Sequence, residues 1–149
     1  MSLKRDVETT AFAVNVLRRM GHHPAYLRIT TGEKPYIVLP GDEEECLDLC
    51  RFFGTHRIRG QKYELHSLGC RIVFSPSITP ANSPDLDGQF AELREFIDAA
   101  ETEGCPTVEA VLHPGKRETI PTVEGDYSDL TTLDTPASIP FFMRSVPAN

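Results

Sequence analysis

Two side chains able to take part in proton transfer, Glu64 and His66, stand two residues apart in a segment that alternates polar and apolar residues. Successive side chains of a β-strand point to opposite faces, so this spacing predicts that both lie on one face of a sheet. A carboxylate beside an imidazole is an arrangement suited to acid–base catalysis. However, no nucleophile is tied to the pair by its spacing, and a charged pair on a solvated strand face is more common. We therefore assign no catalytic residue and favour a non-enzymatic protein, with an enzyme as the alternative.

The densest positive stretch of the sequence surrounds two glycines and consists of Arg51, His56, Arg57, Arg59 and Lys62. Guanidinium groups hold phosphate or carboxylate through two parallel hydrogen bonds, so an anion site is one interpretation. The other is that these charges balance acidic residues of a later helix, namely Asp87, Glu95, Asp98 and Glu101. Together with the strand residues, the candidate ligand-binding side chains are Arg28, Arg57, Arg59, Glu64, His66 and Arg71.

Cysteine spacing raises the question of a zinc site, because Cys46 and Cys50 are four residues apart on a predicted helix and further His and Cys residues follow. Zinc motifs normally contain ligand pairs separated by two residues, which this sequence lacks. Both cysteines also belong to the apolar stripe of their helix, together with Leu49 and Phe53, and free cysteine is a common buried residue. We expect core cysteines, no metal site and no cofactor.

Hydrophobic periodicity predicts three helices and two hairpins in the order α-ββ-α-ββ-α. The expected helices cover residues 5–20, 43–53 and 84–101. The expected hairpins pair residues 25–30 with 35–39 and 62–66 with 70–74. Asp42 and Glu45 have the spacing of a capping box, and Ser83 with Pro84 is typical of a helix start. This order predicts an α+β fold with an antiparallel, mainly four-stranded sheet that helices cover on one face.

Alternation within the hairpins assigns side chains to the two faces of the sheet. The residues expected to face the core are Leu27, Ile29, Tyr63, Leu65, Cys70, Ile72 and Phe74. The residues expected on the exposed face are Tyr26, Arg28, Glu64, His66 and Arg71. Residues 107–112 fit either a fifth strand or a single helical turn.

The first helix is apolar on two faces, one formed by Val7, Ala11, Val14 and Leu17 and the other by Phe12, Val16 and Met20. Such a helix must be covered on two sides, either at the centre of its own domain or by a partner subunit.

Residues 1–112 are expected to form one domain, and residues 113–149 a Pro-rich extended arm. The arm ends in an apolar cluster, Phe141, Phe142 and Met143, of residue types that anchor protein interfaces. We expect the arm to pack on its own domain or on a partner subunit.

The charge balance limits the classes of partner. The 149 residues carry a net charge of −7, and the acidic excess lies in residues 81–149. Because such a chain repels a phosphate backbone, we do not expect nucleic acid to be a partner. No apolar run reaches the ~20 residues of a membrane helix. The four cysteines do not form the dense framework of a small secreted domain, so we expect a cytoplasmic protein with no membrane association.

The leading hypothesis is a non-enzymatic binding or regulatory protein that acts as a homo-oligomer, a dimer in the simplest case, with a further protein partner possible. A second hypothesis is an anionic-ligand domain, or a small enzyme, that uses the exposed sheet face. A third is an inhibitor or immunity-type protein whose acidic surface blocks a basic target.

Overall fold

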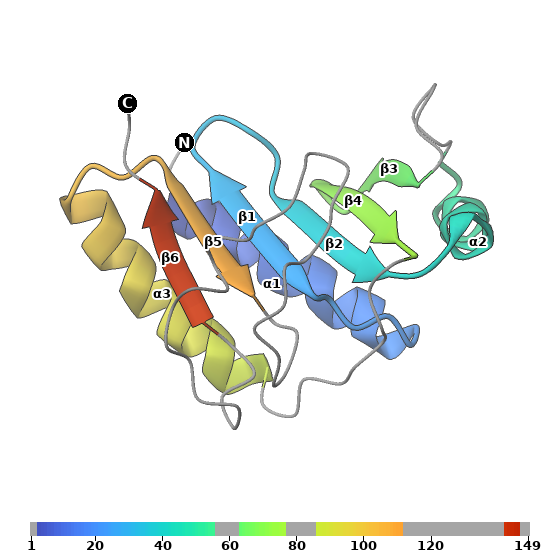
Figure 1. The fold of residues 1–149 in the computed structure, drawn as a ribbon, viewed down its shortest axis with the longest axis horizontal. Coiled ribbons are helices and arrows are strands. Elements are labelled where there is room, and N and C mark those ends of the chain that lie inside the picture. The colour runs from blue at the N-terminus through green and yellow to red at the C-terminus, as the bar shows by residue number, and fades with distance from the viewer. Residues whose placement is uncertain (1–2, 56–62, 77–85, 112–141, 147–149) are drawn as a thin grey trace.

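The computed structural model describes residues 3–55, 63–76, 86–111 and 142–146. These residues form the helices α1 (Leu3–Arg19), α2 (Glu43–Phe53) and α3 (Leu86–Thr102). They also form the strands β1 (Tyr26–Thr30), β2 (Tyr36–Pro40), β3 (Glu64–Ser67), β4 (Cys70–Ser75), β5 (Thr107–Val111) and β6 (Phe142–Val146). The predicted α+β class is confirmed, and each predicted helix and hairpin is present within a few residues of its expected bounds (Figure 1).

The strands make one mixed sheet in the order β3-β4-β2-β1-β5-β6. Both predicted hairpins are confirmed, because β1 pairs antiparallel with β2 and β3 pairs antiparallel with β4. The predicted antiparallel, mainly four-stranded sheet is correct only in part, since β2 and β4 pair in parallel and β5 and β6 extend the sheet beyond β1. Parallel neighbours require a crossover connection, which α2 supplies between β2 and the second hairpin.

Of the two alternatives for residues 107–112, the strand is the one observed, and β5 pairs with β1 along its whole length. Strand β6 pairs antiparallel with β5 and begins with Phe142 and Met143, two of the three residues predicted at the tip of the arm. The backbone of these two residues therefore joins the sheet of its own chain. The arm residues that lie outside the described ranges are 113–141, which include Phe141, and 147–149.

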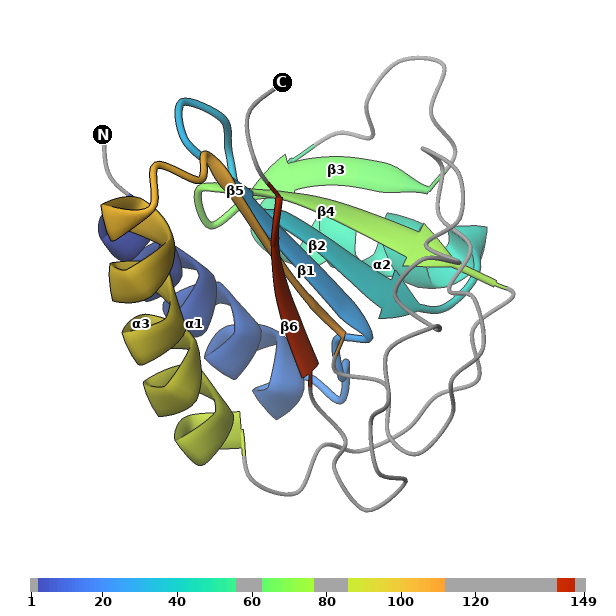
Figure 2. The same cartoon turned by 60° about the vertical axis from the view of Figure 1, so that its left-hand side comes forward.

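Helices α1 and α3 lie side by side against one face of the sheet, and α2 packs at its β3–β4 end (Figures 1 and 2). The strand residues predicted to face the core are buried, or partly buried against it in the case of Tyr63; they are Leu27, Ile29, Tyr63, Leu65, Cys70, Ile72 and Phe74. Burial of one large apolar side chain contributes about 1.5–3 kcal/mol relative to its exposure. This face and the apolar stripes of the helices therefore hold the two layers together.

Helix α1 buries one of its two predicted apolar faces fully and the other only in part, since Met20 packs against the core. Val7, Val14 and Leu17 are fully buried, whereas Phe12 keeps 62% of its surface exposed. The expectation that both faces are covered holds only in part, because α1 packs against the sheet and α3 while Phe12 is left uncovered. Arg94 of α3 donates two hydrogen bonds to the Glu8 carboxylate of α1 and so links the outer surfaces of the two helices.

The start of α2 is fixed by the predicted capping box. The Asp42 carboxylate accepts a hydrogen bond from the Glu45 backbone N–H at 3.0 Å, and the Glu45 carboxylate accepts one from the Asp42 N–H at 3.3 Å. The preceding Gly41 has φ 150° and lies so close to Glu45 and Phe74 that a Cβ would not fit. At the other end, Gly54 caps the helix with φ 65°. The cap predicted for the third helix falls at residues 83 and 84, outside the described residues.

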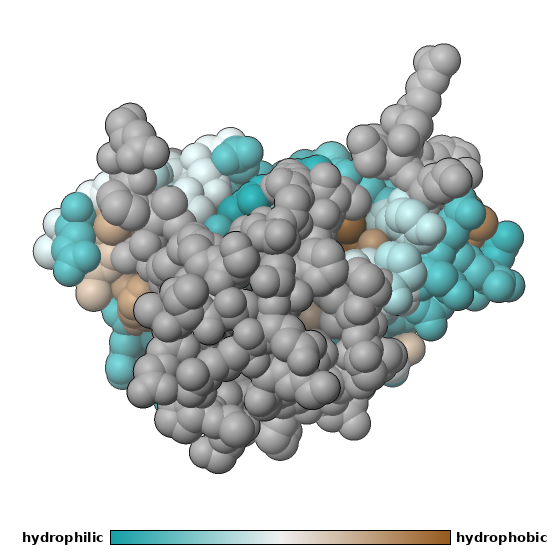
Figure 3. Space-filling model, in the orientation of Figure 1, coloured by the Kyte–Doolittle hydropathy of each residue, from teal (hydrophilic) through white to brown (hydrophobic). Residues whose placement is uncertain are grey.

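The described surface at the α2 end is mainly hydrophilic, as Figure 3 shows, in keeping with the three glutamates of the first turn of this helix. Phe52 is an exception, with 68% of its surface exposed. No helix in the described part of the chain has both the length and the apolar character that crossing a membrane requires.

Candidate functional site

The sheet face turned away from the helices carries both apolar and ionisable side chains. Tyr26 and Glu64 were expected to be exposed on this face, and for these two residues the expectation is wrong, because they are 0% and 4% exposed. Tyr26 belongs to β1, which has a strand on either side, and its ring meets the edge of the Tyr36 ring at 6.2 Å between centroids. The buried Glu64 carboxylate contacts His66 and Arg71 on the same face.

Strand register aligns one polar residue from each strand into a single row across the sheet. Each residue of this polar row is the cross-strand partner of the next, in the order His66, Arg71, Tyr36, Arg28, Glu109 and Arg144. Directly paired residues bring their Cβ atoms within about 4.5–5.5 Å of each other. The register thus aligns residues that are widely separated in the sequence.

Tyr36 lies at the centre of the row and contacts two guanidinium groups. The Arg28 Cζ atom is 4.7 Å from the centre of the Tyr36 ring, and the Arg71 Cζ atom is 4.8 Å from it. Tyr36 is only 2% exposed, so its ring is buried beneath both contacts. A cation held over an aromatic face gains about 0.5–2 kcal/mol. Both arginine side chains therefore pack against the same buried ring.

The Glu64 carboxylate accepts two hydrogen bonds from Arg71, from Nε at 2.5 Å and from Nη2 at 3.1 Å. Only 6% of the Glu64 side chain is exposed, and a carboxylate so deeply buried requires a charged partner. This two-point geometry fixes the orientation of the Arg71 guanidinium as well as its position.

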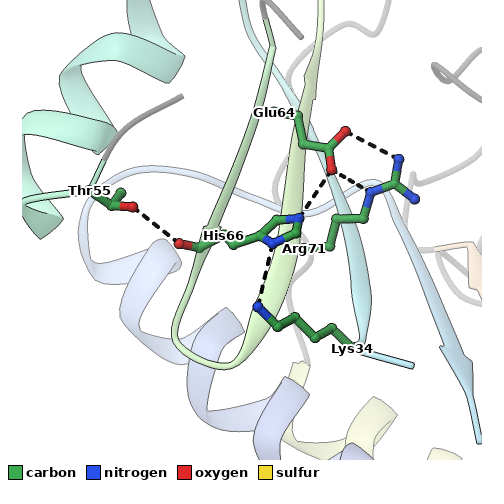
Figure 4. Close-up of polar contacts among 5 residues, drawn as sticks. All are labelled: Lys34, Thr55, Glu64, His66 and Arg71. Atoms are coloured by element: carbon green, nitrogen blue, oxygen red, sulfur yellow. Dashed lines mark hydrogen bonds and ion pairs between the residues drawn. The ribbon is translucent and has the colours of Figure 1, made fainter. Parts of the chain in front are cut away.

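His66 lies between a carboxylate and an ammonium group (Figure 4). Its Nε2 is 3.2 Å from Glu64 Oε2, and its Nδ1 is 3.4 Å from Lys34 Nζ. A carboxylate only accepts and an ammonium only donates, so these partners assign the proton to Nε2 and leave Nδ1 as the acceptor. The His66 carbonyl also accepts a hydrogen bond from the Thr55 hydroxyl at 3.4 Å.

A pocket of about 280 Å³ opens at the end of the sheet near the β1–β2 turn. Its lining residues are Arg28, Thr30, Glu33, Lys34, Tyr36, His66 and Arg71. Three of these side chains are cationic and one is a carboxylate. The pocket is therefore a local concentration of positive charge on a protein whose net charge is −7.

Four of the six predicted ligand-binding residues are brought together at this site, namely Arg28, Glu64, His66 and Arg71. Arg57 and Arg59 lie outside the described residues. Arg51, from the same positive stretch, instead donates a hydrogen bond to Asp48 of its own helix at 2.7 Å.

Sequence reasoning missed four residues that line the pocket, Thr30, Glu33, Lys34 and Tyr36. Lys34 ends the predicted turn of the first hairpin, and Tyr36 follows it at a spacing of two residues. The sequence did not show which side of the sheet each β2 residue faces. All five residues of this strand are buried, so no alternation of polar and apolar residues marks its two faces.

The predicted core cysteines are confirmed, since Cys46, Cys50 and Cys70 are all buried. Burial raises the pKa of the Cys70 thiol to about 12. Among the described residues, no three His, Cys, Asp or Glu side chains are grouped in a way that could hold a metal ion.

The chain has no match among protein-family models, curated proteins or solved structures.

Proposed function

We propose that this protein binds a small anionic molecule in the pocket at the β1–β2 end of the sheet. The observation that carries the proposal is the placement of Arg28 and Arg71 against the buried Tyr36 ring, with both side chains lining the pocket. Side chains that are already fixed lose little conformational entropy when a ligand binds, which favours affinity. Guanidinium groups are also the side chains best shaped to hold a carboxylate or phosphate.

The charges that an anion would meet first at this site are those of the pocket itself. Around the pocket, the cations of Arg28, Lys34 and Arg71 face the carboxylates of Glu33 and Glu64, and the buried Glu109 is the cross-strand partner of Arg28. The acidic residues elsewhere on the surface act over distances at which salt screens them, since the screening length is about 8–10 Å at physiological ionic strength. An anion inside the pocket is therefore attracted by groups that it contacts directly.

Pocket size favours a small ligand. Sites for drug-sized molecules occupy about 300–1,000 Å³, and the present pocket lies just below this range. The lining side chains are mainly charged or hydroxyl-bearing, so they offer a ligand several hydrogen-bonding groups.

Calorimetric titration with malonate and with inorganic phosphate tests the proposal. Lys34 is exposed on the pocket rim, so replacing it with Met removes a cation while leaving the fold intact. Lys34→Met is expected to weaken binding at least about fivefold, the effect of losing a charged hydrogen bond. Lys4→Met is the matched control, because Lys4 is also exposed and pairs with Asp98 on the helical side. Absence of binding to the unaltered protein, or equal losses in both variants, would overturn the proposal.

Self-association is a second candidate function, and the exposure of Phe12 favours it. Phe12 is 62% exposed on the face of α1 that the sequence marks as apolar, and Val16 beside it is half-buried. A second copy of the chain could cover this face through a symmetric contact. Native mass spectrometry of Phe12→Ser should then show a loss of dimer. Phe52→Ser removes an equally exposed ring from α2 and should leave the dimer unchanged. If the unaltered protein is a monomer, self-association is not its function.

A further inference from the structure

The pocket combines carboxylates with its cations. Among the described residues in and around it, the cationic side chains are Arg28, Lys34 and Arg71, and the carboxylates are Glu33, Glu64 and Glu109. Binding sites present charges complementary to those of their partners. A site in which both signs of charge are present therefore suits a ligand that itself carries both.

The three carboxylates differ in their access to a ligand. Glu64 and Glu109 are only 4% and 5% exposed, and Glu64 accepts two hydrogen bonds from Arg71. Glu33 is exposed and lines the pocket, and its carboxylate has no hydrogen bond or ion pair with any residue that the structure describes. Glu33 is therefore the carboxylate that a ligand in the pocket would meet.

The turn between β1 and β2 sets the position of Glu33. The Glu33 backbone N–H donates a hydrogen bond to the Thr30 carbonyl at 3.1 Å, which closes the turn. The neighbouring Thr31 N–H donates to the Pro106 carbonyl at 2.9 Å and joins the turn to the segment before β5. These two bonds anchor the backbone from which the Glu33 side chain reaches the pocket.

We propose that the pocket binds an acidic α-amino acid, whose carboxylates contact the cationic side chains and whose ammonium group contacts Glu33. This inference rests on the proposed anion-binding function and specifies its ligand class. An acidic amino acid has a net negative charge near neutral pH, so it is an anion that also supplies three N–H donors. A carboxylate only accepts hydrogen bonds, and its bond to an ammonium group is about twice as strong as a neutral one.

Titration of the full chain with L-aspartate and with succinate, at matched ionic strength near neutral pH, tests the role of the ammonium group. The two ligands share one dicarboxylate carbon skeleton and differ only in the amino group. Succinate carries the larger negative charge, so attraction to the pocket cations alone would favour succinate. Aspartate is nevertheless expected to bind at least about fivefold more tightly, because of its charged hydrogen bond to Glu33.

Replacing Glu33 with Met removes the carboxylate from an exposed turn position and leaves the cations in place. Aspartate should then bind at least about fivefold more weakly. Succinate loses a repulsive neighbour and should bind no more weakly than before. Glu92→Met is the matched control, because Glu92 is an exposed carboxylate of α3, which packs against the other face of the sheet (Figure 2). Both variants change the net charge of the protein equally.

The possible outcomes separate the two proposals. A preference for aspartate that is lost in Glu33→Met and kept in Glu92→Met supports the inference. Equal binding of the two ligands, tighter succinate binding, an unchanged preference in Glu33→Met, or an equal loss in both variants overturns it and leaves the anion-binding function standing. Binding of malonate or phosphate without aspartate has the same consequence. If malonate, phosphate, succinate and aspartate all fail to bind, both proposals are wrong.

Contact between the ligand and Glu33 can also be observed directly. The carbon-13 chemical shift of the Glu33 carboxyl group should change when aspartate is added and should change much less with succinate. Changes of equal size for the two ligands would contradict the inference.

Discussion

The Glu64 carboxylate and the Arg71 guanidinium form a two-point ion pair although they are not direct cross-strand partners. Strand register places Glu64 opposite Val73 and Arg71 opposite His66, so the pair lies diagonally across β3 and β4. This diagonal leaves His66 free to approach the same carboxylate from its own strand. Arg71 therefore has two roles, since it neutralises a buried charge and lines the proposed anion site.

Replacing Arg71 with Met should destabilise the fold. The change leaves the buried Glu64 carboxylate without its two-point partner, and breaking such a pair costs on the order of 3 kcal/mol. Urea denaturation monitored by circular dichroism measures the free energy of unfolding. Arg51→Met serves as the control, because its pair with Asp48 is exposed and contributes at most about 1 kcal/mol. Equal losses in the two variants would show that the Glu64 pair has no special structural role.

Gly41 should not tolerate a side chain. A Cβ at this position would lie 2.0 Å from Glu45 Oε2 and 2.6 Å from Phe74 Cδ2, and Phe74 is buried in the core. Gly41→Ala is expected to cost about 2–4 kcal/mol, through this clash and the positive φ together. At Gly54 an added Cβ would meet no atom within 4 Å. The loss of stability in Gly54→Ala should therefore come from the left-handed backbone alone and amount to about 1 kcal/mol. A thermal melt that ranks Gly54→Ala as the more harmful change would contradict this comparison.

His22 should make stability fall as the solution becomes acidic. Burial lowers the pKa of the His22 imidazole, which the Glu45 carboxylate opposes in part, and the ring packs edge-on against Phe74. In the unfolded chain, the His22 imidazole takes up a proton as pH falls below its ordinary pKa of 6.5. In the folded protein, the same ring stays neutral to a lower pH. The stability that neutral His22 contributes is therefore present above pH 6.5 and is lost as pH falls through the pKa of His22 in the folded protein. Unfolding free energies measured between about pH 7 and pH 5 should decline less steeply for His22→Gln than for the unaltered protein. Parallel declines would contradict the assignment.

Thiol reactivity should distinguish Cys105 from the other three cysteines. Cys46, Cys50 and Cys70 are buried, and the raised pKa of Cys70 keeps that thiol protonated. Cys105 is half-buried, so a thiol reagent such as Ellman's reagent should modify one group in the folded protein and the others only after unfolding. Cys105→Ser should remove the first phase. A rapid reaction of more than one thiol under native conditions would contradict the described core.

Local patterns account for what the sequence predicted well. The helices follow from apolar spacing, the start of α2 from Asp42 and Glu45, and the hairpins from alternation interrupted by turn residues. Each of these features depends on residues close together in the chain. The same holds for the shared face of Glu64 and His66, which are two residues apart on β3.

Long-range pairing accounts for what the sequence did not reveal. The parallel contact of β2 with β4 depends on where the crossover returns the chain, and Tyr36 is central only because that contact sets Arg71 beside it. The burial of Glu64 has the same origin, since its partner belongs to a different strand. No spacing rule within one strand encodes either relationship.

The position of β5 also has a consequence for the order of folding. Residues 3–76 already contain α1, α2 and the four strands of the two hairpins, whereas β5 joins β1 through residues as distant as Thr30 and Thr107. Contacts between distant segments form slowly because their loop-closure entropy must be overcome first. During synthesis from the N-terminus, β1 is therefore an open edge strand until the ribosome has released β5. A chain released only as far as residue 76 would therefore expose the edge of β1 that β5 later covers.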